Sequence, residues 1–178
     1  MKHVLILTAS LRPRSNSDRL AAAFAEGARE AGHAVETISL KGKRLAFCTG
    51  CLACQKTGRC VIADDARAIA EKVKEADVLV FVSPVYYYSI AGSLKTLFDR
   101  LNPLFAGDYR FREVYFLSAA AEDSEEAKEG PKTAVQGWVD CFEEARLAGT
   151  VFAGGCDAPG AIEGHPALDK ARAIGRAL

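Results

Sequence analysis

The sequence has no excess of charge of either sign and no long apolar run. Its 23 lysines and arginines balance 23 aspartates and glutamates, so nothing in the net charge favours binding to nucleic acid or to a membrane surface. No segment approaches the ~20 apolar residues that a membrane-spanning helix needs. The start of the chain also lacks the apolar stretch and cleavage site of a secretory signal. We therefore expect a cytoplasmic protein that binds neither nucleic acid nor membrane.

Histidine is scarce, and the common nucleotide-binding glycine motifs are absent. The three histidines, His3, His33 and His165, are scattered along the chain, and no Ser–His–Asp constellation is visible. Neither a Walker loop nor a G-x-G-x-x-G turn occurs. The sequence therefore offers no nucleophilic triad and no dinucleotide fingerprint.

What the chain does contain is an alternation of apolar, strand-like runs with helical patterns. Alternation with short links predicts an α/β fold in which a parallel sheet is covered by helices on both faces. A length of 178 residues suits one domain, residues 1–178. Pro131 is expected in the first turn of the fourth helix. The expected strands are His3–Leu7, Ala34–Leu40, Val78–Val82, Val114–Ser118 and Thr150–Ala153, and the expected helices are 17–31, 64–74, 91–101, 131–146 and 166–178.

Four of the six cysteines stand in one compact run, C-x2-C-x2-C-x5-C. The run consists of Cys48, Cys51, Cys54 and Cys60, within a loop at residues 48–60. Thiolates at such short spacing are suited to an iron–sulfur cluster, whose irons each take a cysteine ligand. Structural zinc more often uses two C-x-x-C pairs about 15–20 residues apart. A cluster, zinc, free thiols and a redox disulfide all remain open at this stage.

The loop after the first expected strand leads directly into a helix. A helix N-terminus offers unpaired N–H groups and a partial positive charge, which favour an anion. Short polar side chains and one arginine can add to such a site. A phosphate held in this way suits a single terminal phosphate such as that of FMN, although one serine could instead serve only as the helix cap. The candidate phosphate-binding residues are Ser10, Arg12, Ser15, Asn16 and Ser17.

Two further loops follow the third and fourth expected strands. The first carries three successive tyrosines, whose flat faces and polar tips suit a planar ligand, or else packing against a neighbouring subunit. The second is rich in small residues, which allow the backbone to approach a ring closely. In a doubly wound sheet such loops meet at the carboxyl edge, where ligands bind. The candidate residues are Pro84, Val85, Tyr86, Tyr87, Tyr88 and Ser89 in one loop, and Ala119, Ala120 and Ala121 in the other.

With these segments in view, the chain resembles the NADPH-dependent FMN reductase family and, more narrowly, its iron–sulfur flavoprotein branch. The segments that carry the resemblance are ILTASLRPRSNSDRLA, CTGCLACQKTGRCVIADD, SPVYYYSIAGSLKTLFDR and HPALDKARAIGRAL. The resemblance implies a flavodoxin-like fold with strand order 2-1-3-4-5 and non-covalently bound FMN. It assigns the serine-rich loop to the phosphate and the other two loops to the isoalloxazine ring. The four clustered cysteines would hold a [4Fe–4S] cluster.

The resemblance also implies function. The first hypothesis is an FMN-dependent oxidoreductase that takes electrons from NAD(P)H to flavin, quinone or a similar small acceptor. The second is an electron carrier that exchanges electrons with a ferredoxin-like partner and uses no nicotinamide. A third, a redox or metal sensor built on the cysteine loop, needs no FMN. We also expect a homodimer or homotetramer, since another subunit could cover a flavin that is open on one side.

Overall fold

The computed structural model describes residues 1–178 and contains the predicted α/β fold. Five parallel strands form the sheet in the order β2-β1-β3-β5-β6, which is the predicted order once the additional short strand β4 is allowed for. The short strand, β4 (Ser89–Ile90), pairs antiparallel with the end of β3. The five parallel strands are β1 (His3–Thr8), β2 (Ala34–Ser39), β3 (Val78–Tyr86), β5 (Glu113–Ala119) and β6 (Arg146–Ala153).

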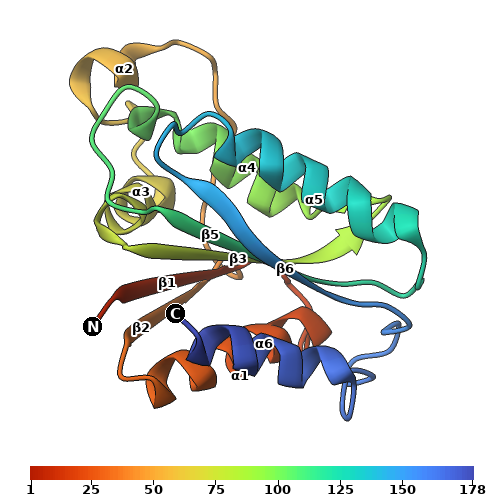
Figure 1. The fold of residues 1–178 in the computed structure, drawn as a ribbon. Helices are drawn as coiled ribbons and strands as arrows, with labels where there is room; N and C mark the ends of the chain where they lie inside the picture. The colour runs from red at the N-terminus through yellow and green to blue at the C-terminus, as the bar shows by residue number, and fades with distance from the viewer.

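Helices cover both faces of the sheet (Figure 1). On one face lie α1 (Asn16–Glu30) and α6 (Pro166–Arg176). On the other lie α3 (Asp65–Glu75), α4 (Gly92–Arg100) and α5 (Glu125–Val139). Two short elements sit beyond the sheet: α2 (Ala53–Thr57), which is part of the cysteine loop, and the 3-10 turn η1 (Asn102–Leu104) next to it.

Strand β1 divides the hydrophobic core into two layers. Successive side chains of a strand point to opposite faces. Val4 and Ile6 accordingly pack into the cluster formed with α1 and α6. Leu5 and Leu7 pack into the cluster formed with α3, α4 and α5. All four side chains are fully buried, so the apolar run predicted from the sequence is a strand covered on both faces.

The predicted bounds of helix α5 are the least accurate of all the predicted elements. It begins at Glu125 rather than near Pro131, because Ser124 caps it by accepting a hydrogen bond from the N–H of Ala127 (3.2 Å). Pro131 therefore lies inside the helix. The helix ends at Val139 rather than near residue 146, and β6 starts at Arg146 rather than at Thr150. The first half of this edge strand is only partly buried, so its residues do not form the apolar run that signals a strand.

Strand β3 also runs further than predicted. It continues from Val82 through Tyr86, so that Pro84, Val85 and Tyr86 are strand residues rather than loop residues. The end of β3 then turns back through β4 as a hairpin. The remaining predicted elements differ from the observed ones by only one or two residues at their ends.

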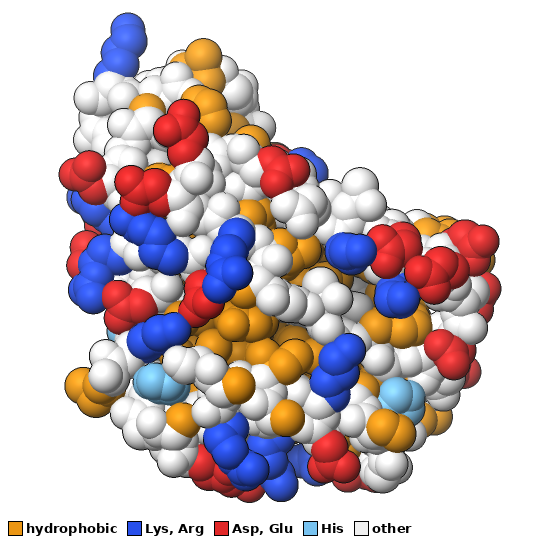
Figure 2. All heavy atoms as spheres, viewed as in Figure 1, with side chains coloured by type: hydrophobic (Ala, Val, Ile, Leu, Met, Phe, Trp, Pro, Cys, Tyr) orange, Lys and Arg blue, Asp and Glu red, His pale blue; other side chains and the backbone are white.

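The surface carries charges of both signs, as the net charge of zero requires. On the face shown in Figure 2, acidic side chains gather over the beginning of α5, whereas acidic and basic side chains are mixed over the rest. Glu125 and Glu126 lie in the first turn of that helix, where negative charge interacts favourably with the helix dipole. No helix has the length and apolar character needed to cross a membrane.

Candidate functional site

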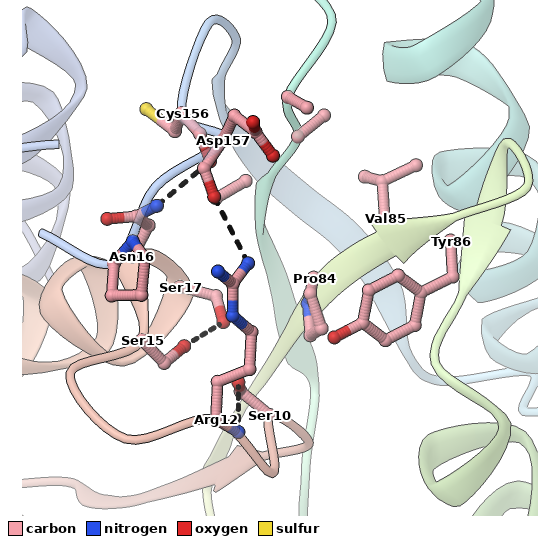
Figure 3. A pocket seen from close by; sticks show the side chains of 14 residues that line it. Ser10, Arg12, Ser15, Asn16, Ser17, Pro84, Val85, Tyr86, Cys156 and Asp157 are labelled. Atoms are coloured by element: carbon pink, nitrogen blue, oxygen red, sulfur yellow. Dashed lines mark hydrogen bonds between the residues drawn. The ribbon is translucent and has the colours of Figure 1, made fainter. Parts of the chain in front are cut away.

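One cavity of about 220 Å³ lies at the carboxyl edge of the sheet. It is formed where the segments after β1, β5 and β6 meet the end of β3, as Figure 3 shows. This is the location expected for a ligand site in a doubly wound sheet. The lining residues are Ser10, Arg12, Ser15, Asn16, Ser17, Pro84, Val85, Tyr86, Ala119, Ala120, Ala121, Cys156, Asp157 and Pro159.

The first turn of α1 forms one end of the cavity. Ser15 is the helix cap, and its hydroxyl accepts a hydrogen bond from the N–H of Asp18 (3.3 Å). The same hydroxyl lies 2.9 Å from that of Ser17. The N–H groups of Asn16 and Ser17 have no carbonyl partner within the helix, because they belong to its first turn. Two hydroxyls and two backbone donors therefore meet at this end of the cavity, and both predicted roles of Ser15, as cap and as lining residue, are compatible.

The side chain of Asn16 is used differently from its predicted role. Its amide donates to the carbonyls of Cys156 and Ala158, both at 2.9 Å. Its carbonyl oxygen accepts from the N–H groups of Gly160 (2.9 Å) and Ile162 (3.3 Å). Both N–H bonds and the oxygen are thereby engaged within the protein. Asn16 lines the cavity but acts by fixing the loop after β6, which leaves its backbone N–H for a ligand.

Arg12 lies on the exposed rim of the same end. Its backbone N–H donates to the hydroxyl of Ser10 (3.3 Å), which is itself buried. Its guanidinium donates to the backbone carbonyl of Asp157 (3.1 Å) and no carboxylate pairs with it (Figure 3). The arginine therefore keeps its positive charge available beside the helix start.

The other end of the cavity is mostly apolar. Pro84, Val85 and Tyr86 come from the end of β3, and Ala119 to Ala121 come from the end of β5. The loops after β5 and β6 are joined by two backbone hydrogen bonds. The N–H of Ala120 donates to the carbonyl of Ala153 (2.9 Å), and the N–H of Cys156 donates to the carbonyl of Ala120 (2.8 Å). The small alanine side chains leave a backbone surface open to a flat ligand.

Three of the residues predicted to contact the ligand lie outside the cavity lining. Tyr87 and Tyr88 form the two-residue turn between β3 and β4, and Ser89 belongs to β4. Tyr87 is fully exposed, whereas the hydroxyl of Tyr88 donates to the carboxylate of Glu122 (2.9 Å). That hydrogen bond raises the pKa of Tyr88. Of the three tyrosines, only Tyr86 reaches the cavity.

Sequence reasoning missed the loop after the last strand. Cys156, Asp157 and Pro159 line the cavity, although none was singled out. The rule that the carboxyl ends of parallel strands share one edge could have found them, because they follow the fifth strand directly. Cys156 is buried, and its thiol donates to the carbonyl of Gly154 (3.3 Å). Burial, together with the charge of Asp123, raises the pKa of this thiol, which keeps it neutral.

The four clustered cysteines line a second, much smaller cavity of about 20 Å³ on the α3–α4 side of the molecule. Cys54 is buried, Cys60 is partly buried, and Cys48 and Cys51 are exposed. No cysteine of the chain is in a disulfide. A hydrogen bond from the backbone of Ala53, followed by one from Thr49, lowers the pKa of Cys51. The four thiols are thus neighbours around one space, and one of them has increased thiolate character.

The four thiols are the right kind of ligand for a metal centre, but they do not lie close enough together to coordinate one. Four soft sulfur ligands suit iron–sulfur clusters and zinc. However, no three histidine, cysteine or acidic side chains in the structure are close enough together to hold a metal ion. Coordination would require the four thiols to move closer together than they lie in this structure.

Curated proteins that are similar to this chain carry the name iron–sulfur flavoprotein. An iron–sulfur flavoprotein of Methanocaldococcus jannaschii is 39% identical over 104 residues, which is 58% of this chain and 54% of that protein. An iron–sulfur flavoprotein of Methanosarcina thermophila is 35% identical over 94 residues, 53% of this chain and 49% of that protein. The matching part of the chain thus spans about half the length of these curated relatives.

Solved structures support the fold over the whole chain. The NAD(P)H:quinone oxidoreductase from Methanothermobacter marburgensis superimposes with a TM-score of 0.76 at 23% identity, covering 98% of this chain and 94% of that one. An azoreductase from Bacillus anthracis superimposes with a TM-score of 0.74 at 21% identity over the whole of both chains. The flavodoxin-like fold is therefore confirmed. Residues 2–140 match the profile described as NADPH-dependent FMN reductase, and the chain belongs to that family.

Proposed function

We propose that this protein is an FMN-dependent oxidoreductase that takes electrons from NAD(P)H to flavin, quinone or a similar small acceptor. One observation carries the proposal. A single open cavity has a polar end at the start of α1, with groups suited to an anion, and an apolar end built from β3 and the β5 loop. Membership of a family described as NADPH-dependent FMN reductase supports the same reaction.

The polar end fits a terminal phosphate. Ser10, Ser15 and Ser17 are all buried, yet their hydroxyls border the cavity. The free N–H groups of the first turn and the helix dipole add attraction for an anion. Arg12 contributes a full positive charge from the rim. We assign the phosphate to these residues and to the backbone N–H of Asn16.

The apolar end fits one part of a flat ring. Pockets that enclose a drug-sized ligand usually measure about 300–1,000 Å³, whereas this cavity measures about 220 Å³. A ligand as large as FMN would therefore be only partly enclosed. Its phosphate would be held inside, and one side of its ring would remain accessible to a second reactant between Tyr86 and Ala120.

The chain itself supplies binding and orientation. Bound FMN would supply the hydride and electron transfer chemistry. Among the lining residues only Arg12, Tyr86, Cys156 and Asp157 carry titratable groups, and the Cys156 thiol is held neutral. The Ala119–Ala121 backbone, tied to the β6 loop, provides a fixed surface against which a ring can be oriented. Because bound FMN would supply the transfer chemistry, we assign no general acid or base to the protein.

The test is an anaerobic titration of the FMN-loaded protein with NADH and with NADPH. We expect at least one nucleotide to bleach the flavin absorbance. Reduction by dithionite but by neither nucleotide would contradict the proposal. A second titration compares FMN with riboflavin, which lacks the phosphate. Ser17→Ala should weaken binding of FMN but not of riboflavin, whereas equal loss for both ligands would contradict the phosphate assignment.

A second candidate function rests on the cysteine loop. The four thiols that line one cavity, together with the names of the curated relatives, favour an electron carrier that holds a [4Fe–4S] cluster and exchanges electrons with a ferredoxin-like partner. Cys48, Cys51, Cys54 and Cys60 would be its ligands. Protein purified without oxygen should then contain about four irons and four sulfides per chain beside the flavin. Flavin without iron in that preparation would rule the carrier out.

Self-association is part of the proposal, because a partly open flavin site can be covered by another subunit. We expect a homodimer or homotetramer in light scattering. A strict monomer at micromolar concentration would contradict this expectation.

A further inference from the structure

We propose that Arg100 and Asn102 are positioning residues that keep the cysteine loop folded and ready for a metal before any metal is bound. The inference rests on the metal-centre part of the proposed function, since it assigns supporting residues to those thiols. Both residues lie at the end of α4 or just after it, and both line the cysteine cavity. Neither has a thiol, so cysteine spacing does not reveal them.

Arg100 joins the two ends of the loop. Its side chain has no exposed surface. One guanidinium nitrogen donates to the carbonyl of Ala46, which precedes the first cysteine (2.8 Å). The other donates to the carbonyl of Ile62, which follows the last cysteine (3.2 Å). A single buried side chain thereby fixes the separation of the segments that bracket residues 48–60.

Asp64 completes this connection. Its carboxylate accepts two hydrogen bonds from Arg100, at 2.7 and 2.8 Å. It also accepts from the N–H of Ala46 (2.8 Å) and, as the cap of α3, from the N–H of Ala66 (3.1 Å). The loop therefore begins and ends on one buried ion pair that is anchored to both α3 and α4. Such a closed stem limits the conformations available to the four cysteines.

Asn102 acts on the cysteines directly. Its side-chain amide donates to the sulfur of Cys54 at 3.3 Å. Cys54 is the one buried thiol of the four, and this contact fixes its position at the base of the cavity. Arg100 lines the same cavity, and its Nε–H is buried without any hydrogen-bond partner. A buried donor without a partner is unfavourable, and a negatively charged thiolate centre would supply the missing acceptor.

Residues that hydrogen-bond to metal ligands orient them, and their loss typically reduces metal affinity by about 10–100-fold. The two ends of the loop are held by Arg100, and Cys54 is held by Asn102. The loop would then be organised without metal, and metal binding would bear less of the cost of ordering it.

The test uses the full-length, FMN-loaded, reduced protein and cobalt(II) as the probe metal. Arg100→Lys keeps the charge but loses the fork that reaches both ends of the loop. Asn102→Asp keeps the shape but replaces the donor to Cys54 by a negative charge. We expect each variant to weaken cobalt binding about 10–100-fold, measured by thiolate-to-cobalt absorbance. Arg19→Lys, at an exposed ion pair of α1, and Gln136→Glu, on the surface of α5, are matched controls and should bind like wild type.

A second readout needs no metal. Hydrogen exchange of residues 46–62 in the metal-free protein should accelerate in Arg100→Lys and remain unchanged in Arg19→Lys. Retained FMN shows that the fold is intact, and if Arg100→Lys does not fold, Asn102→Asp and Asn102→Ala decide the matter. Cobalt affinity within twofold of wild type in the folded variants, with unchanged exchange, would overturn the inference. If wild type itself binds no cobalt, the metal centre fails while exchange still tests the role of Arg100.

Discussion

The side-chain amide of Asn16 donates a 2.9 Å hydrogen bond to the backbone carbonyl of Cys156, across 140 residues of sequence. It joins the first turn of α1 to the loop after β6, and these two segments form the polar end of the cavity. The same side chain accepts a hydrogen bond from Gly160 on the far side of that loop. The shape of the candidate phosphate site therefore depends on one amide whose side chain has no free donor for the phosphate.

Replacing this amide should disturb both folding and ligand binding. Asn16→Ala leaves buried groups of Cys156 and Gly160 without partners, which should cost about 2–3 kcal/mol of unfolding free energy. Because the loop is no longer fixed, we expect affinity for FMN to fall at least about tenfold. Urea unfolding and fluorescence titration of the flavin measure the two effects.

Thr133→Ala is a suitable control, since Thr133 is exposed and its hydroxyl bonds only within α5. It should alter neither quantity. If Asn16→Ala bound FMN as tightly as wild type, the loop after β6 would not shape the site.

The fold was predictable wherever one short segment contained its own signal. Val78–Val82 is entirely apolar and β-branched or aromatic in most positions, so it predicts a buried central strand without knowledge of the rest. The same strand continues through Pro84 to Tyr86, which no local pattern indicates, because its extension depends on pairing with Ala119 and Ile90. The end of β3 is therefore set by pairing with strands that are distant in sequence, and not by its own residues.

The candidate site was predictable in location but not in detail. The serines before α1 and the alanines after β5 could be assigned to the carboxyl edge, because the alternating pattern gives the direction of every strand. The role of Asn16 depended on carbonyls 140 and 142 residues away. The tyrosines could be placed near the site, but a turn of two residues directs Tyr87 and Tyr88 away from the cavity lining. Such turn geometry is not encoded by aromatic composition.

That turn should be strained. Tyr87 and Tyr88 have φ values of +48° and +57°, and a two-residue hairpin with positive φ at both positions strongly prefers Asn-Gly. The double change Tyr87→Asn and Tyr88→Gly should therefore raise the free energy of unfolding by about 1–2 kcal/mol. Affinity for FMN should stay unchanged, because neither residue lines the cavity.

The double change of both tyrosines to phenylalanine serves as the control for the hairpin. It keeps the strained backbone while removing the hydroxyl that bonds to Glu122, so it should not stabilise the protein. A loss of stability in the Asn-Gly variant would mean that side-chain contacts of the tyrosines outweigh the backbone strain.

Helices α1 and α6 approach each other through glycine. A Cβ added to Gly175 would lie 2.2 Å from the carbonyl oxygen of Phe24 and 3.0 Å from the nitrogen of Ala28, which are backbone atoms that cannot turn aside. Gly175→Ala should thus destabilise the protein by about 1–3 kcal/mol. Gly137→Ala is the matched control, because Gly137 is an exposed helix residue and a Cβ added there would have no atom within 4 Å. Gly137→Ala should stabilise the protein by up to about 1 kcal/mol. If denaturant unfolding showed the same change in free energy for both variants, close packing at Gly175 would not be the cause.

The buried pair of Asp64 and Arg100 predicts a specific response to acid. Burial alone would raise the pKa of Asp64, but hydrogen bonds from Arg100 and Ala46 and the charge of Arg100 lower it below its ordinary value. A carboxylate whose pKa is lower in the folded state stabilises the fold above its unfolded pKa, about 3.9, and that contribution is lost as the pH falls through the folded pKa. Wild type should therefore lose stability below about pH 4.

Asp64→Asn leaves Arg100 buried without its charge partner, so it should cost about 3–5 kcal/mol at pH 7. Its stability should then fall less steeply than that of wild type below pH 4, because the carboxylate that takes up the proton is gone. Urea unfolding at pH 7, 5 and 3.5 measures both slopes. Asp140→Asn is the control, because the Asp140 carboxylate is exposed and accepts a side-chain hydrogen bond only from Gln136. Its stability should depend on pH as that of wild type does. Parallel curves for wild type and Asp64→Asn would show that acid sensitivity arises from other carboxylates with lowered pKa values, such as Asp77 and Glu113.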